Sequence, residues 1–287
     1  MPELPEVETI RQDLKKKILN KTITKVIVSN KKIIHTPLSD FIKNLTKNCF
    51  TDIQRRGKLL IFHLKLNDLF LLIHLKMTGQ LIYTTNTSII AGGHSTSKKP
   101  EPVPNRHTHV TIIFSNHNHL FFNDLRQFGY LQLVNKNQLK LILEKYGIEP
   151  LTKNFTYHAF KKIFANKKTN LKSILLNQRL IAGIGNIYAD EICFDAKINP
   201  KTSTQKLSSQ NIKNLYHSTQ KIIKKAIKHR GTTTNNYRDG NGNIGNYKNL
   251  LKVYGQEKKL CPSCRKFPIT KIKFAGRGTH FCPFCQK

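Results

Sequence analysis

Four cysteines near the end of the chain have the spacing of a metal site. They form two CxxC motifs, C-P-S-C and C-P-F-C, separated by seventeen residues: Cys261, Cys264, Cys282 and Cys285. Four thiolates complete a tetrahedral zinc site, and the alternating segment between the motifs can fold as a hairpin around a glycine-rich tip. We therefore predict one structural zinc ion, because four cysteines leave no open position for catalysis. A redox pair of CxxC motifs is the alternative.

The opening of the chain, MPELPEVE, concentrates a scarce kind of residue. Glu3, Glu6 and Glu8 lie within the first eight residues, although the whole chain has only 16 acidic residues against 49 Lys and Arg. The simplest interpretation is structural. Residues 6–18 have apolar side chains at helical spacing, and a helix dipole favours acids in the first turn.

Two glycine-containing motifs offer groups that could hold a phosphate. The stretch GIGNIYADE contains Gly183, Gly185 and Asn186 just before a helical pattern. Backbone N–H groups and an amide at such a turn can hold a phosphate, whereas a dinucleotide fingerprint would need a preceding strand and a third glycine. An ordinary turn between two helices is the alternative. Arg277 lies between two glycines at the predicted hairpin tip, where it could reach a phosphate or a base edge.

Two further motifs combine cationic and aromatic side chains. RRGK ends in Lys58 at a turn into a predicted strand, and NDLRQFG contains Arg126 and Phe128. If extended, the second motif places both side chains on one face, where they could fill a gap in a base stack. Alternatively, the basic cluster is solvated surface and Phe128 belongs to a core.

The overall charge indicates the class of partner. The formal net charge is +33 in 287 residues, which favours binding to nucleic acid or to an anionic membrane surface. The most apolar stretch, LFLLIHLKM at 69–77, is too short to span a bilayer, and no secretory signal is visible. We therefore expect a cytosolic protein.

The hydrophobic pattern changes along the chain from strands to helices. Six short β-rich runs between residues 22 and 134 predict a sandwich or barrel, with a surface loop at 87–105. The runs are TITKVIVS, KLLIFHLKL, LFLLIHL, HVTIIFS, HLFFND and YLQLV. Helical periodicity then predicts helices near 137–145, 157–165, 169–177, 187–194 and 207–229. A Gly/Asn/Thr-rich loop at 231–247 precedes the cysteine module.

A series of motifs in this order resembles the formamidopyrimidine-DNA glycosylase family. They cover nearly the whole chain: PELPEVETI, RRGKLLIF, HLKMTG, NDLRQFG, LLNQRLIAGIGNIYADE, GTTTNNY, VYGQ and IKFAGRGTHFCPFCQ. One departure is Leu125, which stands where the family usually has proline. The resemblance implies a bifunctional enzyme of base-excision DNA repair that removes oxidised purines and then cleaves the abasic site by β,δ-elimination.

The resemblance also assigns roles near the start of the chain. Pro2 becomes the N-terminus when Met1 is removed, and its secondary amine attacks C1′ of the deoxyribose. Glu3 matches the acid that assists opening of the sugar ring, and Glu6 supports the site. Lys58 matches a lysine that engages phosphate and the damaged nucleotide.

The remaining roles implied by the resemblance concern the grip on DNA. Asn186 and Arg277 match phosphate-binding residues, and Arg277 also counts among the catalytic positions. His74 matches a histidine on the phosphate side. The space left by the extruded base is filled by three side chains, Met77, Arg126 and Phe128.

These inferences combine into one prediction. The fold is α+β and multidomain: an N-terminal β-sandwich with a flanking helix (1–135), a helix–two-turn–helix domain (136–230), a lesion-recognition loop and linker (231–252) and a zinc-finger hairpin (253–287). We expect a bacterial, cytoplasmic, nucleoid-associated monomer that binds oxidised double-stranded DNA between its domains and no membrane. The alternatives are an endonuclease VIII-like enzyme for oxidised pyrimidines and a non-catalytic zinc-containing DNA-binding protein.

Overall fold

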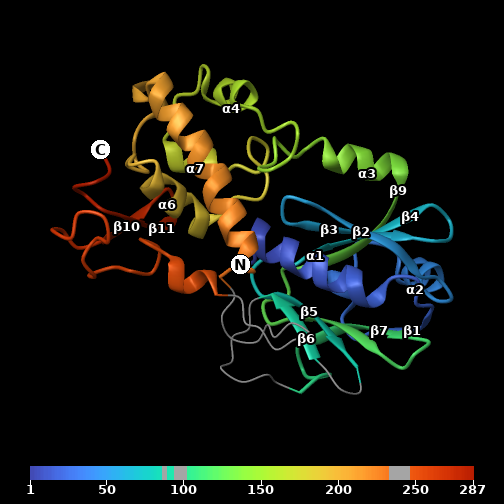
Figure 1. The fold of residues 1–287 in the computed structure, drawn as a ribbon. Coiled ribbons are helices and arrows are strands. Elements are labelled where there is room, and N and C mark those ends of the chain that lie inside the picture. Colours follow the sequence, from blue (N-terminus) through green and yellow to red (C-terminus); the bar gives the residue numbers. More distant parts are fainter. Residues whose placement is uncertain (86–88, 94–101, 233–245) are drawn as a thin grey trace. The chain divides into compact units, whose positions relative to one another are not determined.

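The computed structural model describes residues 1–85, 89–93, 102–232 and 246–287 (Figure 1). The chain forms two compact units. The first unit comprises Met1–Glu144 and His229–Asn246, and the second comprises Lys145–Lys228 and Tyr247–Lys287. Within the described residues, no helix combines the length and apolar character needed to cross a bilayer.

The first unit begins with helix α1 (Leu4–Ile18), as the apolar periodicity predicts. The helix starts two residues before the predicted range of 6–18, because Pro5 is tolerated in a first turn whose N–H groups lack helical partners. Its buried face packs against strands β2 (Phe50–Arg56) and β6 (Ile89–Gly93). Its apolar members are Leu4, Val7, Ile10, Leu14 and Ile18.

Two antiparallel sheets form the body of this unit and confirm the predicted sandwich (Figure 1). One sheet has the order β2 (Phe50–Arg56), β3 (Leu59–Leu64), β4 (Leu69–His74) and β9 (Tyr130–Asn135). The other has the order β1 (Ile23–Val28), β7 (Thr108–Phe114), β8 (His119–Asp124), β5 (Gly79–Thr84) and β6 (Ile89–Gly93). Side chains from both sheets share one core, in which Phe50 lies 6.4 Å from Phe114 between ring centroids. Helices α2 (Leu38–Leu45) and α3 (Lys136–Leu143) complete the unit.

The prediction of a surface loop over 87–105 is wrong at Ile89–Gly93. These residues form β6, which pairs with β5 along its whole length. Gly92 allows helix α1 to approach this strand, since a Cβ there would lie 2.3 Å from Cγ1 of Ile10. Other parts of the predicted loop, 87–88 and 94–101, fall outside the described residues.

The second unit contains four α-helices and a strand pair, counted over its described residues. The helices are α4 (Tyr157–Phe164), α5 (Leu171–Leu176), α6 (Asn186–Asp195) and α7 (Ser209–Lys228), and all four match predicted segments. Asn and Thr side chains cap α4 and α5, as expected for residues that compete well for free N–H groups. Strands β10 (Thr270–Phe274) and β11 (Arg277–Phe281) form the hairpin predicted between the CxxC motifs. Across both units, the described residues include three short 3-10 helices at Lys31–Ile33, Thr204–Lys206 and Tyr247–Leu250.

Candidate active site and metal centre

The acids at the start of the chain do more than favour the helix dipole. Glu3 and Glu6 are 1% and 3% exposed, and they form a capping box at the beginning of α1. One carboxylate oxygen of Glu6 accepts the Glu3 N–H at 2.8 Å, while the other accepts the N–H of Thr232 at 2.8 Å. Glu6 therefore connects the start of α1 to a segment more than 200 residues later.

Gly231 makes this connection possible. It has a φ of +79°, and a Cβ at this position would lie 2.5 Å from Oε1 of Glu6. Glycine alone avoids both the backbone strain and the collision. An ion pair between Arg230 and Asp13 fixes the same segment to α1. The predicted lesion-recognition loop begins here, and its residues 233–245 lie outside the described part of the chain.

The N-terminal amine lies in an environment that favours its neutral form. Burial lowers the pKa of the Met1 amine below its ordinary value, the negative charges of Glu3 and Glu6 oppose this, and the charge of Lys58 lowers the pKa further. An amine is nucleophilic only when it is neutral. The first turn of α1 and Lys58 thus surround the chain terminus with groups that can control a nucleophile.

Lys58 is buried despite its position in a basic cluster. It follows Gly57 in the tight turn between β2 and β3, and only 6% of it is exposed. Gly57 has a φ of +58°, which glycine adopts without strain. The alternative interpretation of RRGK as solvated surface therefore does not describe Lys58.

His74 is held as a neutral ring at the end of β4. Its Nδ1 accepts the backbone N–H of Lys76 at 2.9 Å, so its Nε2 carries the proton and can donate. The ring stacks on Tyr130 with 5.8 Å between centroids. Burial, together with the charges of Lys76 and Lys58, lowers the pKa of His74 to about 3.

This lowered pKa gives a prediction for acid stability. In the unfolded chain His74 is protonated near pH 6.5, whereas in the folded chain it is protonated only near pH 3. The free energy of unfolding therefore decreases as the pH falls between these values. His74→Gln should make the free energy of unfolding less dependent on pH, by up to about 1.4 kcal/mol per pH unit. Urea unfolding at pH 7, 6 and 5 measures this slope. The exposed His117 offers a control, since His117→Gln should keep the wild-type slope; an unchanged slope in His74→Gln would contradict the assignment.

Asp124 organises the turn that carries Arg126 and Phe128. This fully buried carboxylate accepts the N–H of Gly129 at 2.7 Å, the N–H of Arg126 at 3.2 Å and the hydroxyl of Thr78. Thr78 follows the half-buried Met77 in the turn before β5, so one carboxylate fixes both turns. Sequence reasoning missed Asp124, whose only local signal was an acid beside turn residues.

Arg126 and Phe128 form an exposed pair. The segment is not extended, because Gln127 has a φ of +55°, yet the guanidinium carbon of Arg126 lies 4.6 Å from the centroid of the Phe128 ring. Phe128 is 54% exposed, which excludes the alternative that it is a core residue. A rigid exposed aromatic beside a cation is suited to insertion into a base stack.

The second unit brings Asn186 together with the cysteine hairpin. Asn186 is the first residue of α6, and its Nδ2 donates to the carbonyl of Gly278 at 3.0 Å. The tip is a two-residue turn in which Ala275 and Gly276 have φ values of +48° and +70°, so Arg277 begins β11 just after the tip and is exposed. Asn186 and the strand of Arg277 therefore meet at the N-terminal end of a helix, where N–H groups favour anions.

A buried lysine that sequence reasoning missed holds this arrangement. Lys172 of α5 is completely buried, and its Nζ donates to Asp190 at 2.6 Å, to Thr279 at 2.8 Å and to the Gly278 carbonyl at 3.1 Å. Asp190 of α6 also accepts the N–H of His280 at 2.9 Å. A buried ion pair with its hydrogen bonds satisfied fixes geometry, because loss of one partner leaves the other charge unpaired.

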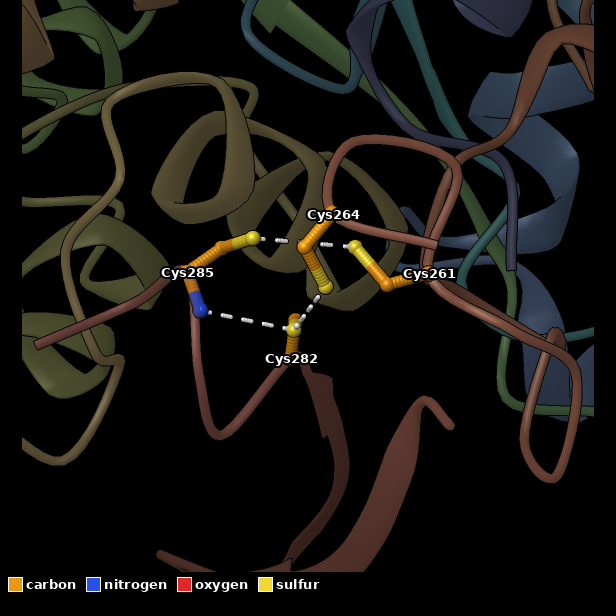
Figure 2. Close-up of side chains that lie close together, drawn as sticks. All are labelled: Cys261, Cys264, Cys282 and Cys285. Atoms are coloured by element: carbon orange, nitrogen blue, oxygen red, sulfur yellow. Dashed lines mark hydrogen bonds between the residues drawn. The ribbon is translucent and has the colours of Figure 1, made fainter. Parts of the chain in front are cut away.

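The four predicted zinc ligands converge (Figure 2). All four sulfur atoms lie within 4.8 Å of one another, and two of the pairs, Cys261 with Cys285 and Cys264 with Cys282, are 3.8 Å apart. A tetrahedron with Zn–S bonds of about 2.3 Å has edges of about 3.8 Å, so the arrangement fits zinc. The four thiols are free cysteines, which excludes disulfides between them. Backbone N–H groups of Lys266 and Phe267 lower the pKa of Cys264 to about 6, which favours the thiolate that binds metal.

Comparisons with known proteins agree along the whole chain. Three family models match: "Formamidopyrimidine-DNA glycosylase N-terminal domain" over residues 1–131, "Formamidopyrimidine-DNA glycosylase H2TH domain" over 146–238 and "Zinc finger found in FPG and IleRS" over 258–287. The zinc-finger match and the cysteine geometry confirm one structural zinc site.

Individual relatives are similar over their full length. A formamidopyrimidine-DNA glycosylase of Listeria monocytogenes is 39% identical, with all of both chains covered. Two crystal structures of the Lactococcus lactis enzyme are 35% identical with complete coverage of both chains. One is a variant bound to DNA containing Fapy-dG, with a TM-score of 0.88, and the other is the wild type bound to DNA containing an oxidised pyrimidine, with a TM-score of 0.86. The chain belongs to the formamidopyrimidine-DNA glycosylase family.

Proposed function

We propose that the chain removes oxidised purines from double-stranded DNA by using the amine of Pro2 as its nucleophile. The protein is a DNA glycosylase of base-excision repair, and its family also has abasic-site lyase activity. The observation that carries the nucleophile assignment is the environment of the chain terminus, where burial, Glu3, Glu6 and Lys58 all act on the pKa of the Met1 amine, one residue before Pro2.

The chemistry follows from these groups. After removal of Met1, the neutral amine of Pro2 attacks C1′ and the nitrogen–carbon bond forms. The damaged base leaves with the electrons of the glycosidic bond and takes up the proton that the attacking amine loses. Glu3 donates a proton to the ring oxygen as the sugar opens, which gives an iminium at C1′. The iminium accepts electrons when the C2′ proton is removed, so the bond to the 3′ phosphate breaks; a second elimination then releases the 5′ phosphate.

Other residues are suited to bind DNA from which the damaged base has been extruded. Asn186 at the N-terminus of α6 and the exposed Arg277 are suited to phosphate, and the neutral His74 offers an Nε2 donor. The exposed Arg126 and Phe128 pair, with Met77 in the neighbouring turn, is suited to fill the space that the base leaves. Double-stranded DNA with a lesion is therefore the proposed partner, consistent with the DNA complexes of the Lactococcus lactis relative.

Oxidised pyrimidines are a second candidate substrate class. The observation that favours them is the complex of the Lactococcus lactis relative with DNA containing an oxidised pyrimidine. We propose purines as the preferred class because the family takes its name from a formamidopyrimidine, which is a ring-opened purine.

We also propose a monomer that works at the bacterial nucleoid in the cytoplasm. The net charge of +33 supports electrostatic association with DNA that does not depend on the DNA sequence. In the proposed division of the chain, residues 1–135 form the catalytic β-sandwich domain and 136–230 form the helix–two-turn–helix DNA-binding domain. Residues 231–252 form the lesion-recognition loop and linker, and 253–287 form the zinc-finger hairpin.

Glu3→Gln tests the acid and the substrate in one experiment. The variant keeps the shape of the side chain but cannot donate a proton, so base release from 8-oxoguanine duplex should fall by about 10²- to 10⁴-fold while DNA affinity is retained. Release should be measured on 8-oxoguanine and thymine glycol duplexes, with undamaged duplex as the binding control. Faster wild-type release of thymine glycol would reverse the substrate preference, and loss of DNA binding in the variant would make Glu3 structural.

A further inference from the structure

The turn that carries Lys58 is connected to helix α1 by charged side chains. Arg55 of β2 donates through Nη1 to the carbonyl of Gly57 at 2.9 Å. The same guanidinium donates through Nε to the carboxylate of Glu8 at 2.9 Å. A continuous path therefore runs from Glu8 through Arg55 to the residue that directly precedes Lys58.

The pair at the centre of this path is largely withdrawn from water. The side chains of Arg55 and Glu8 are 9% and 13% exposed. Burial alone would raise the pKa of Glu8, but hydrogen bonds and positive charges from Arg11 and Arg55 outweigh it, and the pKa lies below its ordinary value. Glu8 is thus an anion at neutral pH. A guanidinium with planar, directed donors can bind this anion and the Gly57 carbonyl together, which a single ammonium cannot do with the same geometry.

Arg11 provides an internal comparison. It binds the same carboxylate, at 2.6 Å from Oε1 of Glu8, but its other contact is the carbonyl of Ile53 in the middle of β2. Arg11 therefore shares the charge environment of Glu8, whereas Arg55 reaches the turn. An ion pair between Lys15 and Asp52 lies on the same two elements, and Asp52 also raises the pKa of Arg11.

We propose that Arg55, held by Glu8, is a positioning residue that fixes the Gly57–Lys58 turn and thereby places the Lys58 ammonium relative to the N-terminal amine. This inference rests on the proposed role of that amine. It also gives the third acid of the MPELPEVE motif a purpose of its own: Glu8 holds the lysine turn, whereas Glu6 holds the Gly231–Thr232 segment.

A displaced Lys58 should change the pH dependence of the reaction. The charged groups that act on the terminal amine of Met1 are Glu3, Glu6 and Lys58, and of these only Lys58 opposes its protonation. We expect the same three groups to act on the Pro2 amine, which is one residue further along the chain. If Lys58 moves away, the two carboxylates act with less opposition and the pKa of the amine rises. A rise of one unit reduces the neutral fraction about tenfold at a pH well below the pKa and by less near it. The rate should therefore fall most at low pH and recover at high pH.

The test compares Arg55→Gln with Arg11→Gln on DNA containing an abasic site, which bypasses base release. Borohydride trapping rates are measured between pH 6 and 9. We expect Arg55→Gln to trap roughly 3- to 10-fold more slowly than wild type at pH 6.5 and to shift the midpoint of the profile to higher pH. Arg11→Gln should keep the wild-type midpoint. If Arg55→Gln fails to fold, Arg55→Lys is measured in its place, because it keeps the charge but cannot bind Glu8 and the Gly57 carbonyl with the same geometry.

The outcomes separate this inference from the proposed function. A wild-type profile in the folded Arg55 variant, or equal shifts in both variants, would overturn the positioning role. A uniform loss of rate at every pH without a shift would also overturn it, since that result indicates general destabilisation. Absence of an N-terminal adduct in the wild-type protein would instead refute the proposed nucleophile.

Discussion

Blocking the N-terminal amine should abolish covalent trapping on DNA while leaving DNA binding nearly unchanged. At pH 7 an α-amine with a pKa of about 8 is roughly one-tenth neutral, whereas a lysine with a pKa of about 10.4 is neutral in about one molecule in 2,500. In the chain that retains Met1, burial lowers the pKa of the terminal amine further. The terminal amine is therefore a far more available nucleophile than a lysine side chain with an ordinary pKa.

The experiment compares protein that begins at Pro2 with protein that retains Met1, whose N-terminal mass distinguishes the two. Incubation with 8-oxoguanine duplex and borohydride should give an adduct on the N-terminal peptide of the first form. The second form should give none, because its primary amine is displaced by one residue. Lys58 is the competing candidate, since it is buried beside the same site. An adduct on the peptide containing Lys58 would refute the assignment to Pro2.

The parts of the fold that sequence predicts best are those specified by local periodicity. Helix α7 carries an apolar stripe over Ser209–Lys228, and its predicted range differs from the observed one by at most two residues at either end. Strand β2 was not predicted because Thr51, Asp52 and Gln54 interrupt its apolar pattern, although Phe50 and Ile53 are buried. Strands β5 and β6 and helix α2 were also missed. Their stability comes from pairing and packing with distant segments, which a short window does not contain.

The same distinction separates the predicted and missed parts of the site. The zinc ligands were predictable because the two cysteines of each CxxC motif are close in sequence and thiol chemistry limits the possible metals. The interactions of Glu8 with Arg55 and of Lys172 with Thr279 were not predictable, since they join residues 47 and 107 positions apart. The resemblance to a family assigned Lys58 to the site, but its burial was not predictable because it depends on how the β2–β3 turn packs.

The zinc site should determine whether the hairpin folds. Its own core is small, with Val253, Cys261, Ile269 and Cys282 as the buried members, and each strand has only five residues. Zinc binding supplies an apparent free energy of about 10–16 kcal/mol in peptides of this kind, which is far more than so small a core can contribute. Cys282→Ser should therefore lose the metal and unfold the hairpin.

Loss of the hairpin should also weaken DNA binding, because the hairpin holds Arg277 and the Gly278 carbonyl that contacts Asn186. Elemental analysis should find about one zinc per wild-type chain and almost none in Cys282→Ser, with a parallel loss of affinity for lesion duplex. Cys193→Ser is the matched control: it removes a buried thiol outside the cluster, so its zinc content should stay near one equivalent. If a Cys282→Ser protein has lost its metal but still binds and cleaves DNA like wild type, zinc is not required for DNA binding by the hairpin. In that case the buried contacts of Lys172 with Asp190 and Thr279 would have to hold β11 in place by themselves.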